Sequence, residues 1–163
     1  MILLAVAAPM SAADRPSGDG LVHVRLGGRF DAGTVQRSLD RARVRLDRPQ
    51  CQRVFTDFRD ESGQPLQDAL DRFGRSGAEH LGTLLFYDGS EQPRCRAART
   101  LAFTFTGSQI VFVCTRTFVE AARRDPVVAD AALIHESLHS LGLGENPPTS
   151  SEITSRVISR CRG

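Results

Sequence analysis

Two histidines four positions apart, His135 and His139, carry the strongest chemical signal in the sequence. On an α-helix, side chains at i and i+4 lie on one face, with Cβ atoms about 5–6 Å apart, so both imidazoles can bind one zinc ion. Glu136 directly follows the first histidine, where its carboxylate can take a proton from a water molecule on that ion. The pattern predicts a Zn²⁺ site with His135 and His139 as ligands and Glu136 as the general base of a hydrolysis.

Two glutamates could supply a third ligand, because a catalytic zinc ion usually has three protein ligands and one position for water. Gly142 lets the chain turn sharply at the end of the helix, and Glu145 follows it. Glu152 lies further along the chain, but the pattern Thr149-x-x-Glu152 has the form of a capping box, which already accounts for it. We therefore expect Glu145 to be the third ligand and keep Glu152 as the alternative.

The segment from the first histidine to Glu145 resembles the extended zinc-binding motif of the metzincins, H-E-x-x-H-x-x-G-x-x-H/D, within the zincin metallopeptidases. Glu145 stands where that family has His or Asp. The segment that follows, Gly-Glu-Asn-Pro-Pro, is also similar to a bacterial group of exported zincin-like proteins. The positions that match the metzincin motif are His135, Glu136, His139 and Gly142.

The resemblance implies a zincin-like fold, in which a twisted mixed sheet is covered by helices and the helix with both histidines lies beneath a cleft. It also implies zinc-dependent hydrolysis of peptide or protein substrates. In gluzincin-type zincins the third ligand is a glutamate on a second helix, which here would be Glu152. The methionine turn of metzincins has no counterpart, because Met1 and Met10 are the only methionines. Residues 146–149 could form the floor of the site in its place.

Hydrophobic periodicity predicts a chain of class α+β. The uninterrupted apolar strand at 110–114 is expected to be central. Under the zincin plan that the resemblance implies, the strand at 101–106 would be the edge strand along the cleft. His23 and His80 are expected on the surface. Strands are predicted at residues 21–26, 54–58, 84–87, 101–106 and 110–114, and helices at 31–46, 65–73, 117–123, 125–141 and 149–161.

The helix that carries the histidines has clear boundaries. Asp125 and Pro126 form a strong start, a capping residue followed by a first-turn proline, and Gly142 ends the helix. Its apolar side chains recur at helical spacing, which predicts a core-facing stripe, and both histidines lie beside that stripe. The zinc site should therefore lie at the edge of a groove. The stripe consists of Val127, Ala131, Ile134, Leu138 and Leu141.

Composition indicates one soluble domain. The chain has 163 residues, of which 40% are apolar and 25% charged, as is typical of a globular protein. The net charge of +2 is too small to indicate binding to nucleic acid or to an anionic membrane. We expect a single zincin-like domain over residues 21–163, a monomer that does not insert stably into a membrane.

The N-terminal segment and the cysteines together indicate export to the periplasm or the medium. Residues 1–20 are expected to form a signal-like apolar segment and a flexible leader, too short in its apolar part to span a bilayer. The cysteines are even in number and widely spaced, as expected for disulfides in an oxidising compartment. Of the three possible connectivities we favour Cys95–Cys114, which flank a predicted hairpin, and therefore Cys51–Cys161.

We interpret the chain as an exported zinc-dependent endopeptidase with Glu136 as general base. One alternative is an exported zinc-binding domain that recognises a partner without cleaving it. Another is a disulfide-stabilised structural or inhibitory domain in which the histidine pattern is incidental.

Overall fold

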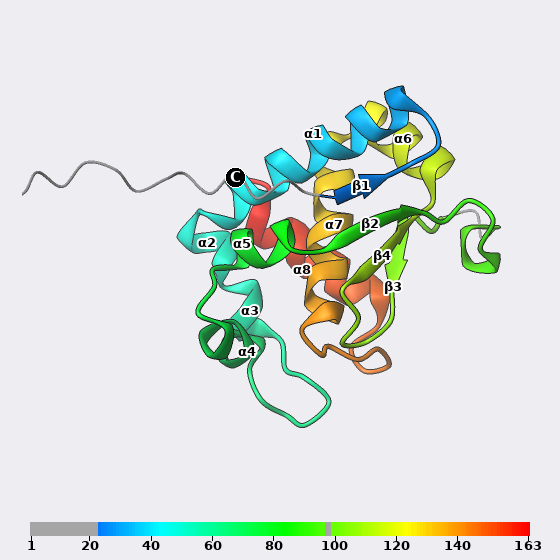
Figure 1. The fold of residues 1–163 in the computed structure, drawn as a ribbon. Helices are drawn as coiled ribbons and strands as arrows, with labels where there is room; N and C mark the ends of the chain where they lie inside the picture. Colours follow the sequence, from blue (N-terminus) through cyan, green and yellow to red (C-terminus); the bar gives the residue numbers. More distant parts are fainter. Residues whose placement is uncertain (1–22, 97–98) are drawn as a thin grey trace, which may run out of the picture.

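A small mixed sheet forms one side of the molecule (Figure 1). The computed structural model describes residues 23–96 and 99–163, so the expected signal-like segment at residues 1–20 lies outside the described residues. Within this part of the chain the strand order is β1-β2-β4-β3, with β1, β2 and β4 parallel and β3 antiparallel to β4. Their bounds are β1 His23–Arg25, β2 Leu85–Asp88, β3 Ala102–Thr104 and β4 Ile110–Val113.

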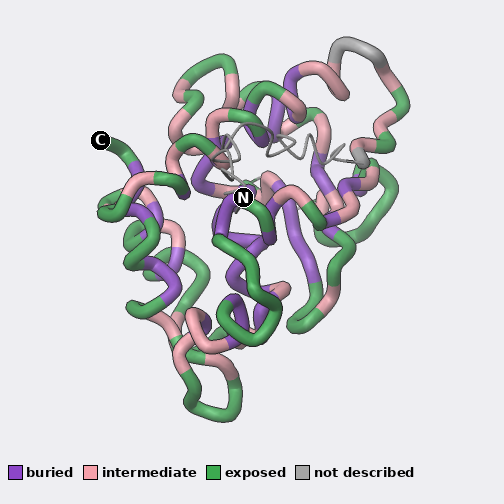
Figure 2. Tube along the Cα trace, turned by 60° about the vertical axis from the view of Figure 1, so that its left-hand side comes forward, coloured by how far each residue is buried: buried purple, intermediate pink, exposed green. Residues whose placement is uncertain are grey.

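Helices cover one face of the sheet, and α7 runs through the centre of the molecule, where it contacts α1, α6, α8 and the edge strand β3 (Figure 1). Buried segments gather around it, whereas the surrounding loops are exposed (Figure 2). The chain therefore has an α+β architecture, as predicted. The helices are α1 Arg29–Leu46, α2 Pro49–Gln52, α3 Val54–Asp57, α4 Leu66–Phe73, α5 Gly77–Gly82, α6 Thr115–Arg124, α7 Pro126–Ser140 and α8 Ser150–Cys161, with a 3₁₀ turn, η1, at Pro93–Arg96.

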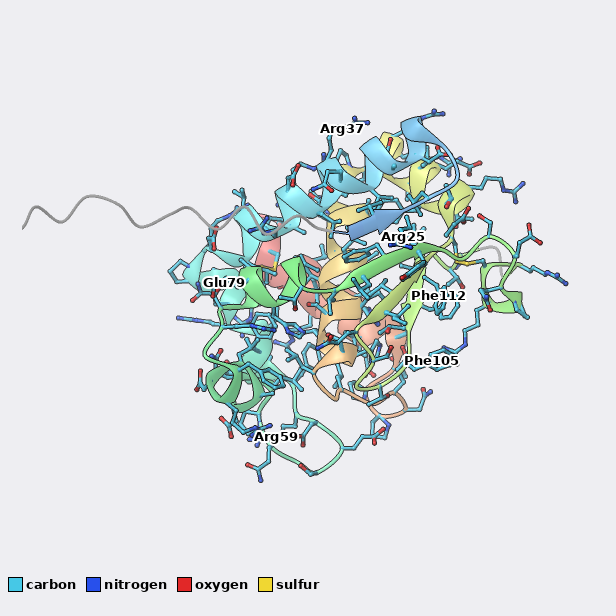
Figure 3. All side chains as sticks on the ribbon, viewed as in Figure 1. Arg25, Arg37, Arg59, Glu79, Phe105 and Phe112 are labelled. Carbon is cyan, nitrogen blue, oxygen red and sulfur yellow. A yellow bond between two sulfur atoms is a disulfide. The ribbon has the colours of Figure 1, made fainter. Side chains whose placement is uncertain are left out.

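The two sheet faces differ because side chains alternate along a strand. Phe86, Val111 and Val113 are buried on the helix-covered face. Phe112 lies on the opposite face, where it is only partly covered and stacks on Phe103 of β3 with ring centroids 5.1 Å apart. Phe112 and Phe105 project from this region of the molecule in Figure 3. The edge strand β3 thus has one face against α7 and one aromatic face toward its other side.

A buried carboxylate ties α7 to α1. Asp130 of α7 is completely buried and accepts hydrogen bonds from Arg41, at 2.9 Å, and Arg45, at 3.1 Å. Arg45 also donates to the Cys161 carbonyl at the end of α8, at 2.7 Å. One acidic side chain therefore helps to hold three helices in register, and it forms contacts that are remote in sequence.

Both favoured disulfides are present. Cys51 of α2 is bonded to Cys161 of α8, and Cys95 of η1 is bonded to Cys114 at the end of β4. The first bond joins two neighbouring helices, α2 and α8. The second holds the segment between β2 and β3 against the sheet.

Two short segments differ from the sequence prediction. The predicted strand at 54–58 is wrong, because Val54–Asp57 is a helical turn that continues directly from α2. Short apolar runs do not distinguish a buried strand from a buried helical turn. The helix α5 was not predicted, although Ser76 and Glu79 form a complete capping box at its start.

One of the two histidines expected on the surface differs from its expected environment, and the other cannot be compared. The expectation of a surface position for His80 is wrong, because α5 packs against α1 and α7 and buries it to 2% exposure. The side chain of His23 lies outside the described residues. Helix α1 begins at Arg29 with Gly28 as its N-cap, so Asp31 lies in the first turn and does not cap it.

Candidate metal centre

The helix α7 presents the three predicted residues from a rigid base. Asp125 caps it by accepting a hydrogen bond from the Val127 N–H at 2.9 Å, and Pro126 occupies its first turn. His135, Glu136 and His139 are 5%, 6% and 7% exposed, so they lie at the boundary of the core. The sequence prediction that they flank a core stripe is confirmed by the complete burial of Ile134 and Leu138.

The two imidazoles and Glu145 converge on one point. The Nε2 atoms of His135 and His139 are 2.9 Å apart. The Glu145 Oε1 atom lies 3.7 Å from the first and 3.3 Å from the second. Among the described residues these three form the group of side chains that could hold a metal ion. The Glu145 side chain is 40% exposed, so the point of convergence is open on one side.

The opposite ring nitrogens are held by fixed partners. His139 Nδ1 donates to the Leu143 carbonyl at 2.7 Å, which leaves the Nε2 lone pair of the neutral ring directed at the convergence point. His135 Nδ1 lies 2.9 Å from the Thr154 hydroxyl of α8. Such partners on the far ring nitrogen are typical of metal-binding histidines, because they set the tautomer and the ring orientation.

The environment also keeps His135 uncharged. Burial, together with the neighbouring His139, lowers the pKa of His135 to about 3. A neutral imidazole is the form that binds a metal ion. The site therefore does not have to release a proton from His135 at neutral pH before a metal can bind.

A turn at the end of α7 brings Glu145 to the histidines. Gly142 has a φ of 106°, a conformation that side-chain-bearing residues rarely adopt. The Gly142 N–H donates to the His139 carbonyl at 3.0 Å, and the Glu61 N–H donates to the Gly142 carbonyl at 3.2 Å. The predicted glycine turn is confirmed, and it reverses the chain so that Glu145 faces the helix it has just left.

The Glu136 side chain extends from α7 to the edge strand β3. The Cys114 N–H donates to the Leu101 carbonyl at 2.9 Å. Since bonding alternates along an antiparallel ladder, Ala102 and Thr104 direct their backbone groups away from β4. The Glu136 carboxylate accepts a hydrogen bond from the outward-facing backbone N–H of Thr104.

The burial of Glu136 has an electrostatic consequence. Burial raises the pKa of Glu136 to about 8. The Thr104 hydrogen bond and the positive charge of Arg94 act against this rise, and the negative charge of Glu145 adds to it. A carboxyl group with a pKa near neutrality can both accept and release a proton, which is the requirement for general acid–base chemistry.

These residues line a cavity of about 400 Å³ between α7, β3 and the loop after α7. Its walls are formed by Arg94, Thr100, Ala102, Phe103, Thr104, Phe105, Thr106, His135, Glu136, His139, Glu145 and Ser150. The edge position predicted for the strand at 101–106 and the central position predicted for 110–114 are both confirmed by the strand order.

The competing glutamate lies elsewhere. Glu152 accepts a hydrogen bond from the Thr149 N–H at 2.8 Å in a complete capping box at the start of α8. It lines a different groove. The capping interpretation of this pattern is confirmed, and Glu145 is the carboxylate that the structure brings to the histidines. Sequence reasoning did not identify Arg94, which lines the cavity from η1, or Thr154, whose hydroxyl contacts His135 from α8, because each lies on an element other than α7.

Comparison of the chain with known protein families, curated proteins and solved structures gives no match. Within the described ranges, no helix has the length and apolar character needed to cross a membrane. Two disulfides are compatible with an exported protein.

Proposed function

We propose that this protein is a zincin-like, zinc-dependent endopeptidase, with His135, His139 and Glu145 as metal ligands. The observation that carries the proposal is the triangle of ligand atoms, with sides of 2.9, 3.3 and 3.7 Å. Tetrahedral zinc with bonds of about 2.0–2.1 Å separates its ligand atoms by about 3.3 Å. The triangle therefore has the dimensions that zinc needs. Two histidines and one glutamate also form a known ligand set of catalytic zinc sites, which leave one position for water.

A zinc ion bound there would supply Lewis acidity to a substrate carbonyl and lower the pKa of a water molecule. The protein's own residues would do the remaining work. The Glu136 carboxylate lies on the cavity wall beside both histidines, where it would accept a proton from the water and deliver it to the leaving amine. Thr104 and Leu143 would hold Glu136 and His139 in place through their backbone hydrogen bonds.

The edge strand suggests how a peptide would bind. The backbone groups of Ala102 and the Thr104 carbonyl face away from β4, whereas the Thr104 N–H already donates to Glu136. An extended peptide could pair with these remaining groups as an added strand. Such pairing would align the peptide backbone along the cavity that contains Glu136. A peptide or protein substrate fits this wall better than a small ligand, because strand addition uses backbone groups that every peptide has.

The proposed setting is outside the cytoplasm. Two disulfides persist in an oxidising compartment, which agrees with the signal-like composition of residues 1–20. We further propose that the protein acts as a monomer in the periplasm or the medium.

The test has two parts. Purified protein should retain zinc in stoichiometric amount, and His139→Ala should lose it. The zinc-loaded protein should cleave members of a broad peptide library, and a chelator or Glu136→Gln should abolish cleavage. Glu152→Gln is the matched control for Glu145→Gln, since only the second should weaken zinc binding.

The outcomes separate the main alternatives. Zinc retention without cleavage would replace the peptidase proposal with a zinc-binding interaction domain. If the protein holds no zinc and His139→Ala changes nothing, the metal site itself is refuted.

A further inference from the structure

The guanidinium of Arg94 lies on the wall of the cavity without an acidic partner. Its carbon atom is 5.4 Å from the centre of the Phe103 ring and 5.2 Å from that of Phe105. Both rings also line the cavity. Arg94 takes part in none of the ion pairs found in the described part of the chain, although its charge acts on the buried Glu136 carboxyl. Its positive charge is therefore available to a ligand.

The position of Arg94 is fixed by its neighbours. The adjacent Cys95 is bonded to Cys114, which is 2% exposed at the end of β4. Gly89 permits a close approach between this segment and the sheet, since a Cβ atom there would lie 2.9 Å from Phe112 Cβ and 3.0 Å from Cys95 Sγ. The disulfide thus holds η1 over the aromatic face of β3, and Arg94 projects from η1.

Charge in the cavity singles out the same residue. Glu136 and Glu145 are assigned to the water and the metal in the proposed function, and the other lining residues apart from the histidines are uncharged. Arg94 is therefore the one permanently cationic side chain among the described lining residues. A guanidinium in cation–π contact with two rings still has N–H groups for a planar, two-point hydrogen bond, for which a carboxylate is the matching partner.

We propose that Arg94 is a specificity-determining residue that binds a carboxylate of the peptide substrate. The carboxylate belongs either to an Asp or Glu side chain near the scissile bond or to a free C-terminus. Phe103 and Phe105 provide an apolar surface for the carbon atoms beside it. Phe105 is 56% exposed and available for this contact. This inference rests on the proposed peptidase function and adds the substrate class to it.

The test measures binding separately from cleavage. Zinc-loaded Glu136→Gln protein would be titrated with fluorescent peptides that carry Glu, Gln or Lys at each position in turn, with free or amidated C-termini. Charge-assisted two-point hydrogen bonds predict about tenfold tighter binding of the carboxylate-bearing peptides. The dependence on a side chain or on the C-terminus identifies the source of the carboxylate.

Variants locate the effect at Arg94. Arg94→Gln should abolish the tenfold preference, and Arg94→Glu should turn it into a preference for Lys, a gain that misfolding could not produce. Arg96→Gln is the matched control, because this exposed arginine belongs to the same turn but is absent from the cavity wall. It should keep the preference.

Two results would overturn the inference. If Arg94→Gln leaves the ranking of peptides unchanged, or if Arg96→Gln removes the preference equally, Arg94 does not read a carboxylate. When the wild-type protein still cleaves peptides in that case, the peptidase proposal stands and only this specificity fails. If no peptide is bound or cleaved, both proposals fall.

Discussion

The hydroxyl of Thr154 offers a sharp test of the metal centre, because it contacts a proposed ligand and not the metal. Its oxygen lies 2.9 Å from His135 Nδ1. When His135 binds a metal through Nε2, its Nδ1 carries the proton and donates it to this oxygen. Thr154→Val keeps the shape of the side chain but removes the acceptor. The buried N–H group then has no partner within the described structure.

The size of the effect follows from this loss. A buried donor without a partner costs about 1–3 kcal/mol, and about 1.4 kcal/mol corresponds to a factor of ten in a dissociation constant. Removal of such an outer partner typically weakens metal binding about 10- to 100-fold. We therefore expect the zinc Kd of Thr154→Val to rise by about this factor.

The assay is a zinc titration in competition with a chromophoric chelator, with circular dichroism as a check on folding. Thr154→Ser keeps the hydroxyl and should bind zinc nearly as tightly as the wild type. Ser155→Ala changes an exposed neighbour on the same helix and should have no effect. A Thr154→Val protein that binds zinc with unchanged affinity would refute the orientation of His135 described above.

Three further predictions concern stability. Replacing Cys51 and Cys161 by Ala removes a disulfide with a sequence separation of 110, which in the chain-entropy model lowers the free energy of unfolding by about 5 kcal/mol. Replacing Cys95 and Cys114, with a separation of 19, should lower it by only about 3 kcal/mol. Urea unfolding of both double variants shows which disulfide stabilises the fold more. Asp130→Ala leaves two guanidinium groups without their buried partner and should cost about 3–5 kcal/mol in the same assay. Burial lowers the pKa of His80 from 6.5 to about 4, so the folded state binds fewer protons than the unfolded state between these values. The contribution of His80 alone should therefore lower stability by about 3 kcal/mol as the pH drops through this window, and the lowered pKa of His135 adds a further part. Unfolding titrations of His80→Gln, which keeps a polar group toward Ser140, should lack only the His80 contribution.

Local signals predicted the central helix and its continuation well. Asp125 and Pro126 give the start of α7, Gly142 gives the turn after it, and Thr149 with Glu152 gives the start of α8. Each signal acts within one helical turn, so no tertiary contact is needed to interpret it. The disulfide pairing was also predictable, because one pair flanks neighbouring strands and leaves one partner for each remaining cysteine.

Contacts between distant segments could not be predicted in the same way. The arginine side chains that donate to Asp130 come from a helix about ninety positions away, as the separations of 89 and 85 show. No local pattern distinguishes Asp130 from a solvated helix residue. The contact of Thr154 with His135 likewise joins two helices and has no local signal in the sequence. The strand prediction at Val54–Asp57 was wrong for another reason, since four residues are too few to show whether the hydrophobic pattern has a helical or a strand period. The capping box of α5 was present in the sequence and could have revealed that helix.

The loop after α7 couples two features of the candidate centre that the sequence presents separately. The Leu143 carbonyl orients His139 by accepting the hydrogen bond from Nδ1, and Glu145 follows two residues later with its carboxylate near both imidazoles. The backbone conformation of Gly142 sets the position of both, because the turn begins there, and a Cβ atom at this residue would lie 3.1 Å from Asp60 Cβ. The orientation of one proposed ligand, His139, and the placement of another, Glu145, therefore depend on one turn. A glutamate can meet the geometry of the proposed third ligand although its side chain is longer than that of aspartate, since this turn, and not the side chain alone, determines the distance to the histidines.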